Sequence, residues 1–322
     1  MEYSYYPGCS LERNANAYHV STMAVAKTLG VKFNELDDWN CCGATEYIAL
    51  NRLAAYALVA RNLALAKQQG GDNHLVAPCS ACFLNLSKAE TYLTEDKKLG
   101  EQVNIALAAG GMHYDAGSLR VRHLLDVFVN DIGYTKIAEK VTHPLKGLNV
   151  APYYGCLIVR PSFQGVFDDH EFPTTLDKLL RTLGARVVDF PLKAQCCGGH
   201  MTQISEKVAL DMLNRLLHSA DDYQADVIVT LCPMCQLNLD AYQENVNRAY
   251  KTTYHIPVLY FTQMIGLALG MGAKELGIGK ELVDARKALS KIGVEVPAEE
   301  EPPKKKRPAK EELPMPRMPQ EE

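Results

Sequence analysis

Cys41-Cys42-Gly43 recurs later in the chain as Cys196-Cys197-Gly198, and these two stretches set the pattern for the residues around them. A single cysteine precedes each pair and a C-x2-C pair follows it. The first set reads C-x31-C-C-G-x35-C-x2-C from Cys9, and the second reads C-x39-C-C-G-x33-C-x2-C from Cys156. Together they contain all ten cysteines, at offsets of 147 to 155 residues. This regular offset indicates an internal repeat.

Residues around the cysteines repeat as well. Leu84-Asn85-Leu86 matches Leu237-Asn238-Leu239, and Thr28-Leu29-Gly30 matches Thr182-Leu183-Gly184. Chance similarity between two cysteine-rich loops would not keep these apolar residues in register, so we infer duplication of a whole domain. The predicted organisation is a first domain over 1–145, a second over 146–275, a C-terminal helical extension over 276–296 and a disordered, proline-rich tail over 297–322.

Short apolar runs alternate with longer segments of helical periodicity in both halves. The runs predicted as strands are 3–6, 31–36, 74–77, 148–154, 186–190 and 227–231. The segments predicted as helices include 15–29, 47–67, 175–183 and 205–219. Such alternation is typical of parallel α/β sheets, whose ligand sites form at the carboxyl ends of the strands. We therefore expect an α/β protein of two duplicated domains, with parallel sheets flanked by helices and a pseudo-twofold relation, and with each half's cysteines at one sheet edge.

The composition is that of an ordinary globular protein and excludes several classes. Of the 322 residues 47% are apolar and 22% are charged, and the formal charge of −4 gives no basic field for nucleic acid. The start of the chain has neither the basic region nor the apolar core of a secretion signal. The apolar stretch 258–271 is shorter than the roughly 20 residues that cross a bilayer, and it is predicted as a buried helix. We expect a cytoplasmic protein with no direct membrane insertion and no nucleic-acid partner.

The cysteine loops are suited to metal or redox chemistry. Five disulfides would fit a small secreted protein, whereas this chain is larger and lacks a secretion signal. Strand-to-helix turns place several cysteines at helix N-termini, where the dipole stabilises a thiolate by about 0.3–1 kcal/mol. Gly43 and Gly198 allow a tight turn after each pair and a close approach of the backbone to a bulky inorganic core.

Zinc is the main alternative to iron and sulfide, because C-x2-C is a common half of a four-cysteine zinc site. Five cysteines exceed the four that a zinc site or a conventional cubane cluster uses. Each set therefore indicates either an unusual cluster or one cysteine outside the cluster. The ferredoxin run C-x2-C-x2-C-x3-C-P is absent from the sequence, so relay clusters are expected on another chain.

Over about residues 1–275 the two Cys-Cys-Gly motifs resemble those of the B subunit of heterodisulfide reductase. The resemblance implies that each motif holds a noncubane [4Fe-4S] cluster and that a disulfide is reduced or formed between the two clusters. It implies one ligand set of Cys9, Cys41, Cys42, Cys79 and Cys82 and a second of Cys156, Cys196, Cys197, Cys232 and Cys235. Electron counting agrees, because opening a disulfide takes two electrons and a cluster generally passes one. No protein nucleophile is then required.

The same resemblance implies partners and a substrate class. The expected partners are an iron-sulfur relay subunit, similar to the family's C subunit, and a flavin-containing subunit, similar to its A subunit. The expected substrate is a small thiol or disulfide, or a protein-bound sulfur. Family members act on the coenzyme M and coenzyme B heterodisulfide in methanogens, and similar subunits serve sulfate-reducing and sulfur-oxidising bacteria.

Three further residues are candidates beside the clusters. Arg13 and Arg160 each lie four residues after the first cysteine of their repeat, a matched position from which either is predicted to pair with an anionic substrate. His200 follows the second pair and is predicted to donate a hydrogen bond to a cluster sulfur or a proton to a departing thiolate. The alternative for each is a solvated surface side chain. His123 is predicted to be structural.

Two other functions are compatible with the sequence. The first is an electron-transfer iron-sulfur subunit of another oxidoreductase, such as the lactate or glycerol phosphate type that also carries Cys-Cys-Gly domains. The second is a zinc-stabilised scaffold subunit without chemistry of its own. Metal content separates the scaffold from both redox functions.

Overall fold

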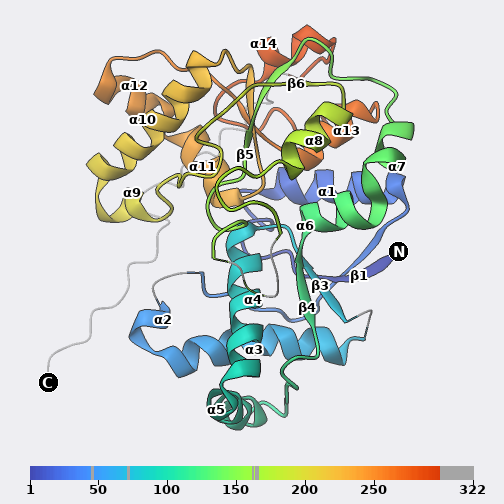
Figure 1. The fold of residues 1–322 in the computed structure, drawn as a ribbon, viewed down its shortest axis with the longest axis vertical. Coiled ribbons are helices and arrows are strands. Elements are labelled where there is room, and N and C mark those ends of the chain that lie inside the picture. Colours follow the sequence, from blue (N-terminus) through green and yellow to red (C-terminus); the bar gives the residue numbers. More distant parts are fainter. Residues whose placement is uncertain (45–46, 71–72, 162, 164–166, 298–322) are drawn as a thin grey trace, which may run out of the picture.

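Each half of the chain contains a four-stranded parallel sheet (Figure 1). The computed structural model describes residues 1–44, 47–70, 73–161, 163 and 167–297. The first sheet has the order β2-β1-β3-β4, formed by β1 (Glu2–Tyr5), β2 (Lys32–Glu35), β3 (His74–Ala77) and β4 (Arg120–His123). The second has the order β6-β5-β7-β8, formed by β5 (Asn149–Tyr153), β6 (Arg186–Val187), β7 (Val227–Thr230) and β8 (Val258–Tyr260). The shared strand order confirms the duplicated α/β architecture.

The strands are short, and their register brings equivalent ends together. In the first sheet the end of β1 pairs with the end of β2 at Tyr5 and Glu35. In the second sheet the end of β5 pairs with the end of β7 at Tyr153 and Thr230. Every residue of β7 is buried, as expected for a parallel strand that helices cover on both faces.

The outer face of each sheet is covered by helices of the same half. In the first half these are α2 (Tyr47–Leu50), α3 (Arg52–Gln68), α4 (Ser80–Glu95) and α5 (Lys97–Ala108). In the second half they are α10 (Glu206–Asp222), α11 (Pro233–Ala241) and α12 (Gln243–Tyr250), and the short α9 (Met201–Ile204) packs against α10. The lower part of Figure 1 contains the first group and the upper part the second, with α4 and α11 meeting near the centre.

The inner faces of both sheets share one apolar layer. Its helical members are α1 (Asn16–Leu29), α6 (Leu124–Asp126) with the π-helical turn η1 (Val127–Gly133), α7 (Tyr134–Glu139), α8 (Thr175–Thr182) and α13 (Phe261–Ala268). Helix α1 of the first half packs against α13 of the second, and α7 of the first half packs against α8 of the second (Figure 1). Helix α8 has the position in the second half that α1 has in the first. Each of these two helices therefore packs against the other half, as a pseudo-twofold relation requires.

Side-chain contacts fix the packing of α1 on the second half. The Tyr18 ring stacks on the Tyr260 ring with centroids 4.3 Å apart. One turn further along α1, the Ser21 and Thr262 hydroxyl oxygens are 2.7 Å apart and hydrogen-bonded. All four side chains are buried. Helix α1 ends at Gly30, whose φ of 74° is a left-handed conformation that favours glycine.

Two predicted elements differ from the structure. The stretch 258–271, predicted as one helix, begins as strand β8 and becomes helix α13 only at Phe261. The helix predicted over 47–67 is interrupted at Asn51, whose backbone is extended and whose side chain accepts a hydrogen bond from the Ala54 N–H. Asn51 therefore caps α3 and separates it from α2.

The C-terminal part of the described chain contains α14 (Arg286–Leu289) and the 3-10 turn η2 (Ser290–Ile292). Both lie within the predicted extension 276–296. Apart from Pro297, the predicted tail 297–322 lies outside the described residues. Among the helices of the described chain, none combines the length and the apolar character needed to cross a membrane.

Candidate functional site

The carboxyl ends of three strands in each half carry the cysteines. In the first half Cys9 follows β1, the Cys41-Cys42 pair follows β2 and Cys79 follows β3. The second half repeats this arrangement after β5, β6 and β7. Because the strands are parallel, these ends meet at one edge of each sheet, as predicted. Cys79 and Cys232 are the N-cap residues of α4 and α11, where the helix dipole favours a thiolate.

The five thiols of each half form a continuous chain of contacts. In the first half the hydrogen-bonded order is Cys9, Cys41, Cys42, Cys82 and Cys79. The Cys42 and Cys82 sulfurs are 3.2 Å apart. In the second half the order is Cys156, Cys196, Cys197, Cys235 and Cys232, and the Cys197 and Cys235 sulfurs are 3.5 Å apart.

The two chains of thiols meet at one buried contact. The Cys79 sulfur lies 4.0 Å from the Cys232 sulfur, and both residues are buried. At the opposite end of each chain the first two cysteines are less covered: Cys9 and Cys41 are exposed, whereas Cys156 and Cys196 are half-buried. All ten sulfurs are therefore connected, and the second set is the better enclosed.

Hydrogen bonds between the thiols lower the pKa of one cysteine of each pair and raise the pKa of the other. The pKa of Cys41 is lowered to about 2 because Cys42 and Cys9 donate hydrogen bonds to its sulfur. The pKa of Cys42 is raised to about 12, chiefly because its own proton is held in the bond to Cys41. The second half behaves alike, with the pKa of Cys196 lowered to about 2 and that of Cys197 raised to about 12. Adjacent sulfurs cannot all become thiolates unless a cationic centre compensates their charge.

Backbone N–H groups point at the paired sulfurs. Gly43 and Gly198 donate to the sulfurs of Cys41 and Cys196, respectively. Gly43 has a φ of 67° and Gly198 a φ of 90°, so each position favours glycine by its backbone conformation. A Cβ on Gly43 would meet no atom within 4 Å, so the tight turn, rather than crowding, accounts for this glycine.

Close approach to the sulfurs occurs instead at two glycines that were not predicted as site residues. A Cβ built on Gly8 would lie 3.0 Å from the Cys82 sulfur, and one built on Gly155 would lie 3.0 Å from the Cys235 sulfur. Both glycines also have positive φ values, 77° and 67°. The repeated Gly-Cys at the start of each set was the sequence signal for them.

Four other supporting residues were also missed and also occur in equivalent pairs. The Asn85 amide donates to the Cys42 carbonyl at 3.1 Å, and the Asn238 amide donates to the Cys197 carbonyl at 3.2 Å. The hydroxyls of Tyr6 and Tyr153 each donate, at 2.8 Å, to the carbonyl of the residue just before the cysteine pair. The matching Leu-Asn-Leu triplets of the sequence are the signal that could have found the two asparagines. These bonds fix the loops that present the paired cysteines.

A cavity of about 300 Å³ lies against the second set of cysteines and is bounded by both halves. All five second-set cysteines line it, whereas none of the first five, all of which the structure describes, does so. Its first-half wall consists of Ala44, Ser80, Ala81, Leu84 and Asn85. Ala44 and Gly199 occupy equivalent repeat positions, as do Ala81 and Met234, and all four line the cavity. The cavity therefore lies where the two halves face each other.

A larger hollow, of about 810 Å³, lies between α5 and residues 113–116. It has no cysteine in its lining. We therefore assign the site to the smaller cavity, which the cysteines line.

The structure places neither predicted arginine in the lining of this cavity, although Arg160 lies close enough to Cys196 for its charge to act on that sulfur. Arg160 donates to Glu171 at 2.8 Å and to the Ala194 carbonyl, so it braces the loop before the second cysteine pair. Arg13 is exposed and lines a separate hollow together with Glu12 and Glu35. Neither arginine lines the cavity, and the pairing of either with an anionic substrate stays a prediction. Their matched sequence positions diverge because the loop after Cys156 is much longer than the loop after Cys9.

The two histidines near the site have different surroundings. His200 lines the cavity, as its predicted role requires. His123 is fully buried, and its Nδ1 accepts a hydrogen bond from the Leu125 N–H at 3.1 Å. Burial lowers the pKa of His123 to about 4, so its ring is neutral at pH 7. Its Nε2 lies 3.4 Å from the Ser80 hydroxyl, beside the cavity wall.

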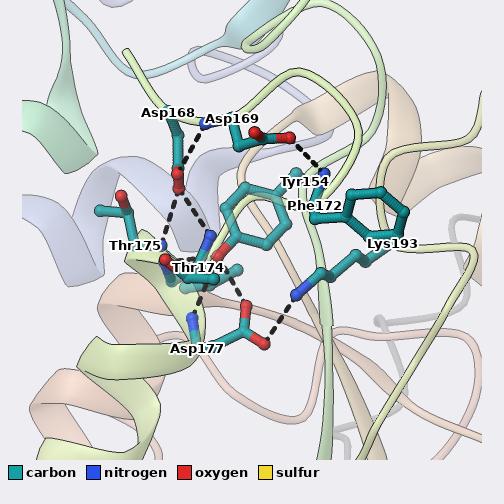
Figure 2. A network of polar contacts seen from close by, with 9 residues as sticks. Tyr154, Asp168, Asp169, Phe172, Thr174, Thr175, Asp177 and Lys193 are labelled. Carbon is teal, nitrogen blue, oxygen red and sulfur yellow. Dashed lines mark hydrogen bonds and ion pairs between the residues drawn. The ribbon is translucent and has the colours of Figure 1, made fainter.

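A buried network braces the second cysteine set (Figure 2). The Tyr154 hydroxyl donates to Asp177 at 2.6 Å and accepts from the Leu176 N–H at 2.7 Å, at the start of α8. The Lys193 ammonium forms an ion pair with Asp177 at 2.9 Å, and both side chains are largely buried. The network joins the segment before Cys156 to the segment before Cys196. At the equivalent position of the first half Pro7 stands in place of Tyr154, so the hydroxyl at the centre of this network is not repeated there.

The donor set suits an iron-sulfur cluster. Thiolate sulfurs are the usual ligands of such clusters, and N–H bonds to them tune the potential. In the described part of the chain, no group of three or more His, Cys, Asp and Glu side chains is arranged as the ligands of a metal ion. The sulfurs instead form chains of neighbours, and Gly8 and Gly155 leave room beside two of them.

Comparison with known proteins identifies the repeated unit. The model of the cysteine-rich domain named CCG matches residues 3–87 and again 150–240. The chain is 37% identical, over 89% of its length and 98% of the relative, to the 8-methylmenaquinol:fumarate reductase membrane anchor subunit of Wolinella succinogenes. It is 32% identical, over 90% of its length and 96% of the relative, to the B subunit of a ferredoxin/F(420)H(2)-dependent CoB-CoM heterodisulfide reductase of Methanosarcina acetivorans.

One solved structure shares the fold. A hypothetical protein from Helicobacter pylori aligns over 87% of this chain with a TM-score of 0.69 and 16% sequence identity. The aligned region is 52% of that protein's length. The agreement supports the duplicated α/β architecture alone.

Proposed function

Because the chain belongs to the family of heterodisulfide reductase B subunits and contains the cysteine-rich CCG domain twice, we propose that it is the subunit of an oxidoreductase that reduces or forms a disulfide between two [4Fe-4S] clusters of the noncubane type. The observation that carries the proposal is the cavity between the halves, which the second cysteine set lines and whose opposite wall is first-half backbone and side chain. A ligand held there would contact the second cysteine set and the first half at the same time.

The clusters would supply the two electrons that opening a disulfide consumes, one from each set. The balanced reaction takes one disulfide, two electrons and two protons to two thiols. The electrons come from a partner that carries one-electron centres. We propose an iron-sulfur relay subunit and, beyond it, a flavin-containing subunit as these partners, and the cytoplasm as their compartment.

The chain's own residues position the ligand and exclude water. The buried Cys79–Cys232 contact shortens the path between the two cysteine sets. Ser80 and Asn85 offer hydrogen bonds from the first half, and His200 offers an imidazole from the second. We propose that His200 donates a proton to a departing thiolate, and its replacement by Gln tests that role.

Metal content is the first test of the proposal. Anaerobically reconstituted protein is expected to carry about eight iron and about eight sulfide per chain, as two four-iron clusters require. Protein that binds two zinc ions and no sulfide would exclude both redox functions. Iron in one half alone would leave too few electrons for a two-electron reaction.

Replacing Cys42 or Cys197 by Ser tests whether both sites act together. If each set supplies one electron, either variant loses disulfide reduction even when the other half retains its cluster. Iron content must be measured for each variant, since a misfolded chain would give the same loss. Substantial turnover by either variant, with its damaged site shown to be empty, would contradict the two-cluster mechanism.

The fumarate reductase relative supports a second candidate function. A 37% identical protein named a membrane anchor subunit of a methylmenaquinol-dependent enzyme favours an electron-transfer subunit that passes electrons between a quinol and a partner. The two functions differ in what exchanges electrons with the clusters. A disulfide reoxidises dithionite-reduced clusters in the first case, and a naphthoquinol reduces oxidised clusters in the second, so absorbance changes after each addition discriminate between them.

A further inference from the structure

We propose that Arg160 raises the reduction potential of the metal centre held by the second cysteine set, because its guanidinium is a fixed positive charge beside that set. The inference rests on the iron-sulfur clusters of the proposed function and is the same for a disulfide reductase and for an electron-transfer subunit. Reduction adds one negative charge to a centre, so a nearby cation favours the reduced state. Arg160 acts through Cys196 and is a positioning residue rather than a catalytic one.

Two loops of the second half hold Arg160 in place. Its backbone N–H donates to the Cys156 carbonyl at 2.9 Å, in the turn that follows this cysteine. Its guanidinium donates to the carbonyl of Ala194, two residues before Cys196, and to Glu171 at 2.8 Å. Arg160 therefore joins the loops that carry the first two cysteines of the set. Its side chain is only 32% exposed.

The charge of Arg160 acts on the Cys196 sulfur. The pKa of Cys196 is lowered to about 2, chiefly by the hydrogen bonds from Cys156 and Cys197, and the Arg160 charge contributes to this lowering. A positive field that favours negative charge on this sulfur also favours the electron added to a centre that the sulfur holds. The position of the guanidinium is therefore suited to shift a reduction potential.

Neighbouring charges leave part of this field in place. Glu171, the acidic partner of Arg160, is 58% exposed, so water screens its charge more than that of the guanidinium. Lys193, three residues before Cys196, is different because its partner Asp177 lies 2.9 Å away and is largely buried with it. The opposite charges of that buried pair compensate each other, whereas Arg160 is compensated only in part.

The enclosure of the second set explains why a cation is useful there. The first two cysteines of the second set are half-buried, whereas those of the first set are exposed. Burial disfavours the added negative charge of a reduced centre, so the second centre would be the harder one to reduce without a compensating cation. Arg160 opposes this effect of burial.

The matched position of the first half provides a control. Arg13 also lies four residues after the first cysteine of its set, but it is exposed. It lines a hollow together with two acidic residues, Glu12 and Glu35. Solvent and these carboxylates both weaken its field, so we expect Arg13 to have little influence on either centre.

Redox titrations of the cluster-loaded protein, followed by EPR, test the inference without any turnover. The signal that is lost in Cys197→Ser identifies the second centre. At a fixed potential, we expect Arg160→Gln to lower the ratio of reduced to oxidised second centre about fivefold, which is about 40 mV at the 59 mV per tenfold of a one-electron step. In Arg13→Gln the same ratio should change less than about twofold.

Two further variants separate charge from structure. Arg160→Lys keeps the positive charge without the planar fork and should retain most of the wild-type midpoint potential. Glu171→Gln removes the opposing carboxylate and should raise the midpoint of the second centre. A purely structural role predicts lower or unchanged midpoints in all three variants of this pair, so the rise in Glu171→Gln is decisive.

The outcomes distinguish this inference from the proposed function. A second-centre midpoint that stays at its wild-type value in Arg160→Gln, with both centres loaded, overturns the inference and leaves the proposed function standing. If Arg160→Gln fails to hold its second centre, the titration of Glu171→Gln decides, and a midpoint that does not rise overturns the inference. Wild-type protein that holds zinc and no sulfide overturns the proposed function and the inference together.

Discussion

Single glycines beside the cysteine sulfurs set how much room each site has. A methyl group added at Gly8 would lie 3.0 Å from the Cys82 sulfur. Cys82 could not move away from this methyl group while it holds a bound cluster. We predict that Gly8→Ala loses the first cluster and lowers the iron content from about eight to about four per chain. Inductively coupled plasma analysis of anaerobically purified protein measures this.

The matched control for that variant is Gly30→Ala. Gly30 has nearly the same positive φ, 74° against 77°, but a Cβ there would meet nothing within 4 Å. Its substitution should cost about 1–2 kcal/mol of stability from backbone strain and leave both clusters in place. If both variants lose equal amounts of iron, strain rather than crowding of the sulfur is responsible.

The burial of His123 affects how the stability of the protein responds to acid. Its pKa falls to about 4 because burial disfavours the charged ring, whereas an unfolded histidine titrates near 6.5. The unfolded state therefore binds a proton first as the pH falls. The titration of His123 therefore leaves the free energy of unfolding unchanged above pH 6.5 and lowers it by about 3 kcal/mol between pH 6.5 and pH 4.

The variant His123→Asn isolates this contribution, because an Asn oxygen can accept the Leu125 N–H hydrogen bond that Nδ1 accepts now. Between pH 7.5 and pH 5 the melting temperature of the wild type should fall more steeply than that of the variant. Anaerobic thermal melts at several pH values provide the comparison. Parallel pH profiles would show that another group governs the acid response.

At the scale of elements, the ion pair of Lys193 with Asp177 ties the start of α8 to the second cysteine loop (Figure 2). Replacing Asp177 by Asn leaves a largely buried ammonium without its partner, which should cost about 3 kcal/mol. We predict loss of iron from the second site and retention at the first. The double variant Asp177→Asn with Lys193→Met should recover part of the loss, because no charge then remains unpaired. Iron loss equal to that of the single variant would show that the network acts through hydrogen bonds instead.

The sequence predicted elements well where periodicity was unambiguous and less well where it was not. The strand before Cys79 was placed at 74–77, as the structure has it. The run 258–271 was misjudged because a short, continuous apolar stretch fits a buried strand and a buried helix equally. Repeat position did not give Arg13 and Arg160 equivalent surroundings, because the longer segment after Cys156 supplies Glu171 as a partner of Arg160.

At the scale of the whole molecule, the ten cysteines and their division into two sets could be predicted, whereas the docking of the halves could not. A repeat reveals what each half contains and says nothing of which faces meet. The stacking of Tyr18 on Tyr260 and the bonds from the Tyr18 hydroxyl to the carbonyls before Cys79 and Cys232 are long-range contacts of this kind. The cavity lining depends on the same docking.

Tyr18 therefore provides a test of how far the two sites depend on each other. Tyr18→Ala removes a fully buried ring between the halves and should cost about 3–5 kcal/mol. We predict that both clusters are depleted. Tyr56→Ala removes a buried ring of α3 within the first half and should deplete only the first. Mössbauer or EPR spectra with iron analysis identify which site is lost, and loss of a single cluster in Tyr18→Ala would contradict the shared role.

The packing of α1 against α13 also determines when this protein can finish folding during its synthesis. Helix α1 leaves the ribosome among the first residues, but its partner begins only at Phe261. At about 5–20 residues per second, tens of seconds pass before that surface can be covered. In that interval the β1–β4 sheet has its strands but lacks its inner apolar contacts from the second half. Stable metal insertion at Cys9, Cys41, Cys42, Cys79 and Cys82 must then follow release of the nearly complete chain, and a nascent chain stalled before residue 250 should bind no iron there.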